Sequence, residues 1–424
     1  MKKIAVIMLS ILLLFSVVSC SKSSKEATSS TNEKNVTLTF QIWDINQKAG
    51  MEAMCASYTA LHPNVKIEVQ VTNWSEYWTK LEASATGSQI PDIFWMHTNE
   101  ILKYADNGIL ADLSDIVEKD KFSEISLANA SGSNGKLYGV PKDKDTVCLV
   151  YNKEMFDKAG VSYPDENWTW DDLTNASASI YKATGKYGYM AYADDQLGYW
   201  NFVYQAGGYI LNEDKTQAGF TQSATQKAMK FYIGLQREDW CPTQTYFAET
   251  APGDAFFSEK GAMYFEGSWN LLAELENYPE MVGKWDVAVL PKCPDPIVGD
   301  GRATISNGLS YSAGAKNKNL EVIKDVLKFF GSQEGQILQG EKGAAIPAYE
   351  NTEYSWISCF DKYPVDITKV TDMFAYGVQS VNNASRPEWK SKVSDTLLKI
   401  YAGEIDIDSG LKQMQKIVDD LSKN

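Results

Sequence analysis

In the first part of the chain, segments with the hydrophobic pattern of a strand alternate with segments predicted to be helices. Val36–Trp43 and Val65–Val71 alternate with the period of two that is typical of a strand, and Pro91–Met96 is an apolar run typical of a buried strand. Between them, Met51–Leu61 and Trp74–Thr86 are predicted helices. This order of strand, helix, strand, helix and strand predicts an open α/β sheet with right-handed crossovers.

The later part of the chain mixes strands and helices in the same way. Thr146–Tyr151 and Trp285–Pro291 are predicted strands. Thr169 opens a capping signal for a helix, and Ala224–Gln236 and Asn319–Ser332 are predicted helices, the last one strongly amphipathic. No segment repeats at a fixed period, so a solenoid is not expected.

The N-terminal segment has the organisation of a lipoprotein signal. Lys2 and Lys3 precede the apolar run Ile4–Val18, which is too short to span a bilayer comfortably, and Cys20 follows it. We expect a signal peptide at residues 1–19, acylation (palmitate) on the Cys20 thiol, and a flexible tether over residues 20–35. The alternative is an ordinary secretory signal with an incidental cysteine. Because no later apolar run is long enough for a transmembrane helix, the expected location is extracytoplasmic, held to the cell membrane by lipid.

Composition narrows the range of ligands. The chain has 40 Lys and Arg against 55 Asp and Glu, a net charge of −15, which argues against nucleic acid as a partner. Only two histidines are present, which rules out a multi-histidine metal site, and the six cysteines lack zinc-ligand spacing. We therefore expect no metal and no cofactor. Arginine, which binds carboxylate or phosphate bidentately, occurs only at Arg237, Arg302 and Arg386, so a neutral ligand is favoured.

Aromatic and polar residues follow two of the predicted strands. Trp43 and Asp44 come at the end of the first strand, and Trp95, His97 and Asn99 come at the end of the third. In open α/β sheets, ligands bind beyond the carboxyl ends of the strands. Aromatic rings cover the apolar faces of sugars, while carboxylates and amides bond to their hydroxyls, so these residues suit a neutral, polyhydroxylated ligand.

Several blocks along the chain resemble a known family. They are Ser88–Leu113, Lys136–Pro141, Val150–Gly160, Trp168–Leu173, Gly261–Trp269, Trp285–Pro291, Ala313–Lys318 and Ala344–Pro347. In order and spacing they resemble the extracellular solute-binding proteins of family 1, the carbohydrate receptors of ABC importers, among them the maltodextrin-binding proteins.

The resemblance implies an α/β fold of type II with two discontinuous lobes, joined by a hinge, and a ligand in the cleft between them. The lobes would be residues 36–146 with 304–348, and residues 147–303 with 349–424. The implied ligand-binding residues are Trp43, Asp44, Trp95, His97, Asn99, Asp145, Tyr199, Trp200, Gly267, Ser268, Trp269 and Asn307.

The function that the resemblance implies is capture of a neutral sugar or oligosaccharide by lobe closure, and its delivery to the permease subunits of an ABC importer. The protein would be a monomer and not an enzyme. The alternative from another class is a membrane-anchored glycoside hydrolase, which needs two carboxyl groups placed across the scissile bond. Carboxylates are plentiful enough that the sequence by itself does not exclude such a pair. The chain lacks the G-x-S-x-G and H-E-x-x-H motifs of serine hydrolases and metalloproteases.

Overall fold

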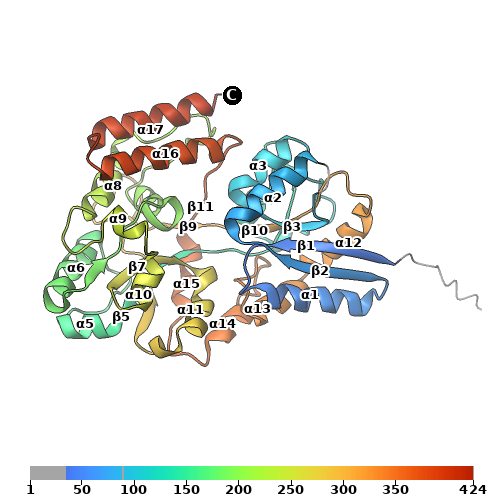
Figure 1. Ribbon diagram of the computed structural model, residues 1–424, viewed down its shortest axis with the longest axis horizontal. Helices are drawn as coiled ribbons and strands as arrows, with labels where there is room; N and C mark the ends of the chain where they lie inside the picture. Colours follow the sequence, from blue (N-terminus) through green and yellow to red (C-terminus); the bar gives the residue numbers. More distant parts are fainter. Residues whose placement is uncertain (1–34, 88–89, 424) are drawn as a thin grey trace, which may run out of the picture. The chain divides into compact units, whose positions relative to one another are not determined.

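The computed structural model describes residues 35–87 and 90–423 of the chain (Figure 1). The predicted signal peptide, Cys20 and nearly all of the tether lie outside these residues. Within the described part of the chain, no helix is long and apolar enough to cross a membrane.

Two sheets form the centre of the fold. The first has five strands in the order β2 (Val65–Val71), β1 (Val36–Ile42), β3 (Ile93–His97), β10 (Leu309–Ser312) and β4 (Val140–Pro141). Strand β1 runs parallel to β2 and β3, while β10 runs antiparallel to β3 and β4. The second sheet has the order β6 (Tyr187–Tyr189), β7 (Gly261–Gly267), β5 (Val147–Asn152) and β8 (Trp285–Ala288). We call the parts of the molecule built on these two sheets the N-terminal lobe and the C-terminal lobe.

Helices surround both sheets (Figure 1). Those that carry the N-terminal lobe are α1 (Lys48–Leu61), α2 (Trp74–Thr86), α3 (Thr98–Asp106), α4 (Glu124–Asn129), α12 (Leu320–Phe330) and α13 (Gln333–Glu341). The others are α5 (Lys153–Ala159), α6 (Trp170–Thr184), α7 (Trp200–Gln205), α8 (Ser223–Leu235), α9 (Gln244–Phe247), α10 (Pro252–Phe257), α11 (Leu271–Asn277), α14 (Tyr354–Ile357), α15 (Thr368–Asp372), α16 (Arg386–Tyr401) and α17 (Ile407–Leu421). The α/β fold class is confirmed.

Strand β3 is buried on both faces of its sheet. Ile93 and Trp95 belong to the apolar cluster that includes α1 and α12, whereas Phe94 and Met96 belong to the cluster formed with α2 and α3. This alternation is the period of two that a strand dictates. With helices on both faces, the first polar side chain is that of His97, the last residue of the strand.

Capping residues in the sequence predict where two of the helices begin. The predicted helix Trp74–Thr86 has the same bounds in the structure, and Asn73 caps it by accepting a hydrogen bond from the backbone N–H of Glu76. Thr169 and Asp172 form the expected capping box at the start of α6. Both helices begin where a side-chain oxygen satisfies a free backbone N–H.

The chain passes between the two sheets in more than one place, and these segments pair with one another. Strand β9 (Thr304–Ser306) runs parallel to β11 (Gly377–Gln379). Asp145, just before β5, pairs with Asn307, just after β9, through two backbone hydrogen bonds of 3.0 and 3.2 Å. Asp143 pairs with Pro347. The exact division of the chain into lobes stays a prediction.

Candidate functional site

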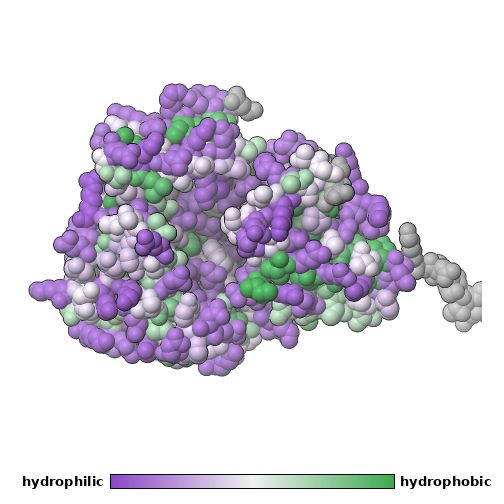
Figure 2. All heavy atoms as spheres, in the orientation of Figure 1, coloured by the Kyte–Doolittle hydropathy of each residue, from purple (hydrophilic) through white to green (hydrophobic). Residues whose placement is uncertain are grey.

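A pocket of about 390 Å³ collects residues from both lobes and from the segments between them. This volume lies in the range of roughly 300–1,000 Å³ that small-molecule sites occupy. Figure 2 shows a hollow with hydrophilic residues at the middle of the face in view. The pocket is lined by Trp43, Asp44, Gln47, Trp74, His97, Asn99, Asp143, Asp145, Asp194, Asp195, Gln196, Leu197, Trp269, Asn270, Asn307, Leu309 and Lys390.

Tryptophans form one wall of the pocket. Trp43 makes edge-on contacts with Trp74 and Trp95, each with a centroid distance of 5.0 Å. Trp74 is 48% exposed, whereas Trp95 is fully buried beneath Trp43. The ammonium of Lys142 lies 4.6 Å from the centre of the Trp95 ring. Trp95 therefore supports the wall from behind, while Trp43 and Trp74 are the rings that reach the pocket.

A chain of polar side chains runs beneath this wall. Lys142 is fully buried, and its Nζ lies 2.6 Å from Asp143 Oδ2 and 2.8 Å from Gln47 Oε1. Gln47 in turn donates to Asp44 Oδ2 at 3.1 Å, and the backbone N–H of Leu309 donates to Asp143 Oδ1 at 2.6 Å. A buried cation thus orients three of the polar groups that line the pocket.

Asp145 lies where the chain passes between the sheets. The hydroxyl of Ser268, at the end of β7, donates to Asp145 Oδ1 at 2.9 Å. Burial raises the pKa of Asp145, and the nearby Asp143 carboxylate raises it further, while Lys142 and the Ser268 hydrogen bond oppose the shift. The carboxyl is 3% exposed and Oδ2 has no hydrogen-bond partner among the described residues, so one acceptor remains available in the pocket.

The opposite wall contains a three-residue charge cluster. Asp195 lies in the short π-helix Asp195–Tyr199, and its two oxygens accept from Arg386 Nη2 at 2.8 Å and from Lys390 Nζ at 2.9 Å. Burial by itself would raise the pKa of Asp195, but Lys390 and Arg386 outweigh it and lower this pKa to about 2. For Asp194, burial and the charge of Asp195 raise the pKa.

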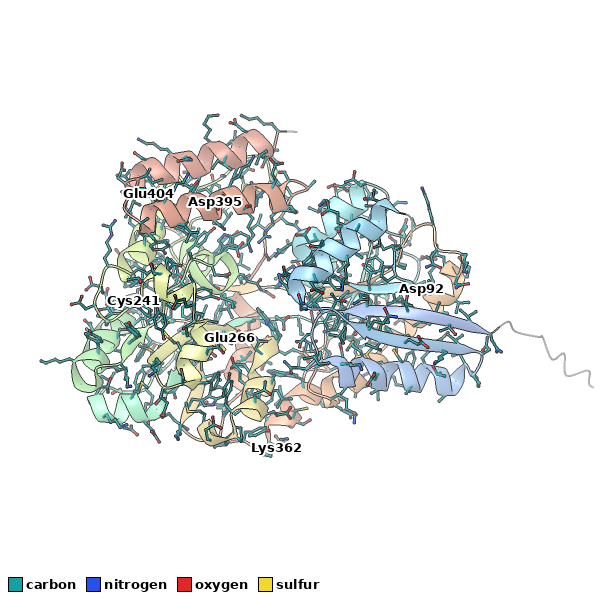
Figure 3. The ribbon with its side chains drawn as sticks, viewed as in Figure 1. Asp92, Cys241, Glu266, Lys362, Asp395 and Glu404 are labelled. Atoms are coloured by element: carbon teal, nitrogen blue, oxygen red, sulfur yellow. The ribbon has the colours of Figure 1, made fainter. Side chains whose placement is uncertain are left out.

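The turn after β7 carries Trp269 into the pocket. Glu266, labelled in Figure 3, accepts from the backbone N–H of Gly267 at 2.7 Å and from Asn270 Nδ2 at 3.0 Å. A Cβ on Gly267 would lie 2.2 Å from the Trp269 ring, so only glycine leaves room for that ring. The turn is therefore shaped by residues on both sides of Trp269.

The structure brings seven of the predicted ligand-binding residues to the pocket: Trp43, Asp44, His97, Asn99, Asp145, Trp269 and Asn307. Five others do not line it. Trp95, Tyr199 and Trp200 are buried in the cores of their lobes, while Ser268 and Gly267 lie behind Asp145 and Trp269. Within the described residues, no group of three or more His, Cys, Asp or Glu side chains is placed to hold a metal ion.

Several pocket residues were not predicted from the sequence. They are Gln47, Trp74, Asp143, Asp194, Asp195, Gln196, Leu197, Asn270, Leu309 and Lys390. The pair Asp194-Asp195 precedes Tyr199 and Trp200 by only a few residues. The non-helical backbone at Gly198 breaks the helical path, so the chain presents its acidic residues and buries its aromatic ones.

Comparison with known proteins identifies the family of this chain. A sequence model described as "Bacterial extracellular solute-binding protein" matches residues 43–337, which is well over half of the chain. The chain belongs to this family. Proteins of this family are receptors and not enzymes, and they act outside the cytoplasm.

Two individual relatives of this chain are also named as binding proteins. An arabinooligosaccharide-binding protein of Bacillus subtilis is 27% identical over 355 residues, covering 79% of this chain and 78% of the relative. A galactooligosaccharide-binding protein of the same organism is 23% identical over 363 residues, covering 82% and 81%.

Solved structures show the same fold. An ABC substrate-binding protein of Listeria monocytogenes, in complex with cycloalternan, superposes with a TM-score of 0.81 at 22% identity, covering 91% of this chain and 98% of the other. The GacH receptor of Streptomyces glaucescens gives a TM-score of 0.80 at 23% identity, with 92% and 98% covered. These likenesses confirm the two-lobed α/β fold of this solute-binding protein.

Proposed function

We propose that this solute-binding protein captures a neutral sugar or oligosaccharide in the pocket and delivers it to the permease of an ABC importer. The observation that carries the proposal is the combination of tryptophans from both lobes with carboxyl and amide groups between them. Trp43 and Trp74 come from the N-terminal lobe and Trp269 from the C-terminal lobe. Rings of this kind cover the C–H faces of a sugar, and the polar groups bond to its hydroxyls.

The charge balance of the pocket supports a neutral ligand. Lys142 neutralises Asp143, and Arg386 with Lys390 more than neutralises Asp195. Burial raises the pKa of Asp145 and of Asp194, which opposes a negative charge on either carboxyl group. The cations beside the pocket are therefore already paired, and an anionic ligand would meet no unpaired positive charge among the described pocket residues.

The names of the relatives point to the same ligand class. Two relatives are named for arabino- and galacto-oligosaccharides, and two structures of the same fold were solved with cycloalternan and acarbose. These names describe those proteins, and they make oligosaccharides the first compounds to test with this one.

Lobe closure is the proposed mechanism of capture. A ligand that touches both lobes stabilises the state in which they approach each other, by the difference between its affinities for the two states. The permease would then recognise the closed pair of lobes. Acylation of Cys20 would keep the protein at the membrane, and a Cys20→Ala variant should then carry no acyl group at residue 20.

A thermal-shift screen of the purified protein tests the ligand class. The panel contains neutral mono- and oligosaccharides, amino acids and polyamines. A ligand that binds the native state raises the free energy of unfolding by RT ln(1 + [L]/Kd), so the sugars should raise the melting temperature and be recovered intact. Shifts from amino acids or polyamines and none from sugars would contradict the proposal, and consumption of the sugar would favour the glycoside hydrolase.

A further inference from the structure

His97 is held between two polar partners at the floor of the pocket. Its Nδ1 accepts a hydrogen bond from the backbone N–H of Asn99 at 3.0 Å, where α3 begins. Its Nε2 lies 2.9 Å from one of the two polar atoms of the Asn307 side-chain amide. The imidazole is 7% exposed, so no large part of it is left to water.

These contacts fix the position of the imidazole proton. Burial lowers the pKa of His97 to about 3, and the positive charges of Arg386 and Lys390 act in the same direction, so the ring is neutral near pH 7. A neutral imidazole has one N–H donor and one acceptor nitrogen. Because Nδ1 accepts from a backbone N–H, the proton must be on Nε2.

The proton on Nε2 in turn orients the amide of Asn307. Two donors cannot bond to each other, so the amide atom 2.9 Å from Nε2 must be the oxygen. Oxygen and nitrogen of a carboxamide have nearly the same shape, and the hydrogen-bond network decides which is which. The NH₂ group then takes the other position, whose atom is buried and has no partner among the described residues.

An unpartnered buried donor in a pocket wall points to a ligand. Asn307 is 4% exposed and lines the pocket, and leaving a buried polar group unbonded is unfavourable. Asn307 is also paired through its backbone with Asp145, whose Oδ2 is free. A donor and an acceptor on paired residues suit a hydroxyl group, which accepts one hydrogen bond and donates another.

We propose that Asn307 determines ligand specificity by donating its NH₂ to a ligand hydroxyl beside Asp145, and that His97 is the positioning residue that fixes this amide orientation. The inference rests on the proposed function, because it assigns a role within the same sugar pocket. It requires that the ligand place an oxygen atom where it can accept a hydrogen bond from the Asn307 NH₂ group.

Nitrogen NMR tests the first half of the inference without any ligand. The chain has only two histidines, so a long-range ¹H–¹⁵N spectrum of the labelled protein contains two imidazoles, and a His62→Gln variant assigns them. His97 should show a protonated Nε2 and an unprotonated Nδ1 throughout pH 5–8. A proton on Nδ1, or a mixture of both tautomers, would overturn the inference.

Ligand binding tests the second half. In the ¹H–¹⁵N spectrum, the side-chain NH₂ of Asn307, assigned by its loss in Asn307→Leu, should shift when arabino- or galacto-oligosaccharides are added. Asn307→Leu, which removes the donor at similar size, should bind these sugars about 10- to 100-fold more weakly. Asn107→Leu makes the same change at an exposed position and should bind like the wild type.

The two possible failures are distinguishable. An unshifted Asn307 NH₂ in a wild type that binds these sugars would overturn the inference but leave the proposed function intact, as would an affinity of Asn307→Leu within about twofold of the control. If the wild type bound none of these sugars, the oligosaccharide proposal would fail. The NMR measurement of which His97 nitrogen carries the proton would then be the test of the amide orientation of Asn307.

Discussion

Lys142 and Asp143 form an ion pair that is buried on both sides: Nζ and Oδ2 lie 2.6 Å apart, and the side chains are 0% and 1% exposed. Breaking such a pair by removing one partner leaves an uncompensated charge and destabilises a protein by about 3–5 kcal/mol. Lys142→Met should therefore lower the free energy of unfolding by about this amount, measured by urea denaturation.

Lys136→Met is the matched control for this substitution. Lys136 pairs with Asp112 at 2.7 Å on the surface, where solvent screens the pair, so its loss should change stability far less. Equal effects of the two substitutions would show that Lys142 is not the buried charge that organises the wall of the pocket.

The charge cluster of Asp195, Arg386 and Lys390 predicts a specific pH dependence. The folded-state pKa of Asp195 is lowered to about 2, below the unfolded value of roughly 3.9, so the ionised form stabilises the fold above that unfolded value. This contribution, on the order of 2 kcal/mol, is lost as the pH falls from about 4 towards 2. The difference in melting temperature between wild type and Asp195→Asn should be largest at pH 5–7 and should shrink below pH 4. A difference that stays constant from pH 7 to pH 3 would contradict the assignment, with the exposed Asp214→Asn as control.

The buried carboxyl groups of Glu266 and Glu274 predict that stability falls as the pH rises, which is opposite to the effect of Asp195. Both are buried, burial raises the pKa of each, and the charge of Glu266 raises the pKa of Glu274 further. Since the folded state keeps a proton that the unfolded state releases above roughly pH 4.3, this pair loses stability as the pH rises. Glu274→Gln replaces one of these carboxyl groups with an amide that cannot ionise, so the variant should become more stable relative to wild type between pH 5 and pH 8. Parallel stability curves over this range would contradict the raised pKa of these carboxyl groups.

Sugar binding should release protons. Asp145 and Asp194 each use one oxygen in a hydrogen bond within the protein, and burial raises the pKa of both. Ligand hydroxyls that donate to the remaining oxygens favour the ionised carboxylates, so binding should strengthen as the pH rises through the titration of the free protein. Calorimetric titration in two buffers of different ionisation enthalpy gives the number of protons. Proton uptake, or no exchange at all, would contradict this role for the two carboxyl groups.

Much of the fold follows from local pattern in the sequence. The alternation in Val65–Val71 and the helix Trp74–Thr86 appear in the structure with the predicted bounds, since neighbouring residues specify them. Residues at or directly after the ends of strands, such as Trp43, Asp44 and His97, also line the pocket as expected from the edge of an α/β sheet.

The rest of the site depends on contacts between distant parts of the chain. Lys390 reaches the pocket because α16 packs beside the turn that holds Asp195, far away in sequence. Trp95 and Trp43 are equally aromatic and close to strand ends, but β3 is covered on both faces, so Trp95 is enclosed while Trp43 emerges. Periodicity does not separate these two outcomes.

Calorimetric titration of the wild type and Trp269→Ala with the sugar found in the thermal-shift screen tests the central claim most directly. Trp269 is partly exposed in the pocket and belongs to none of the three apolar clusters of the described residues, so its loss should leave the melting temperature of the free protein nearly unchanged. Loss of its contact with the sugar face should weaken binding about 10- to 100-fold. An affinity equal to that of the wild type would show that the sugar is not bound in this pocket.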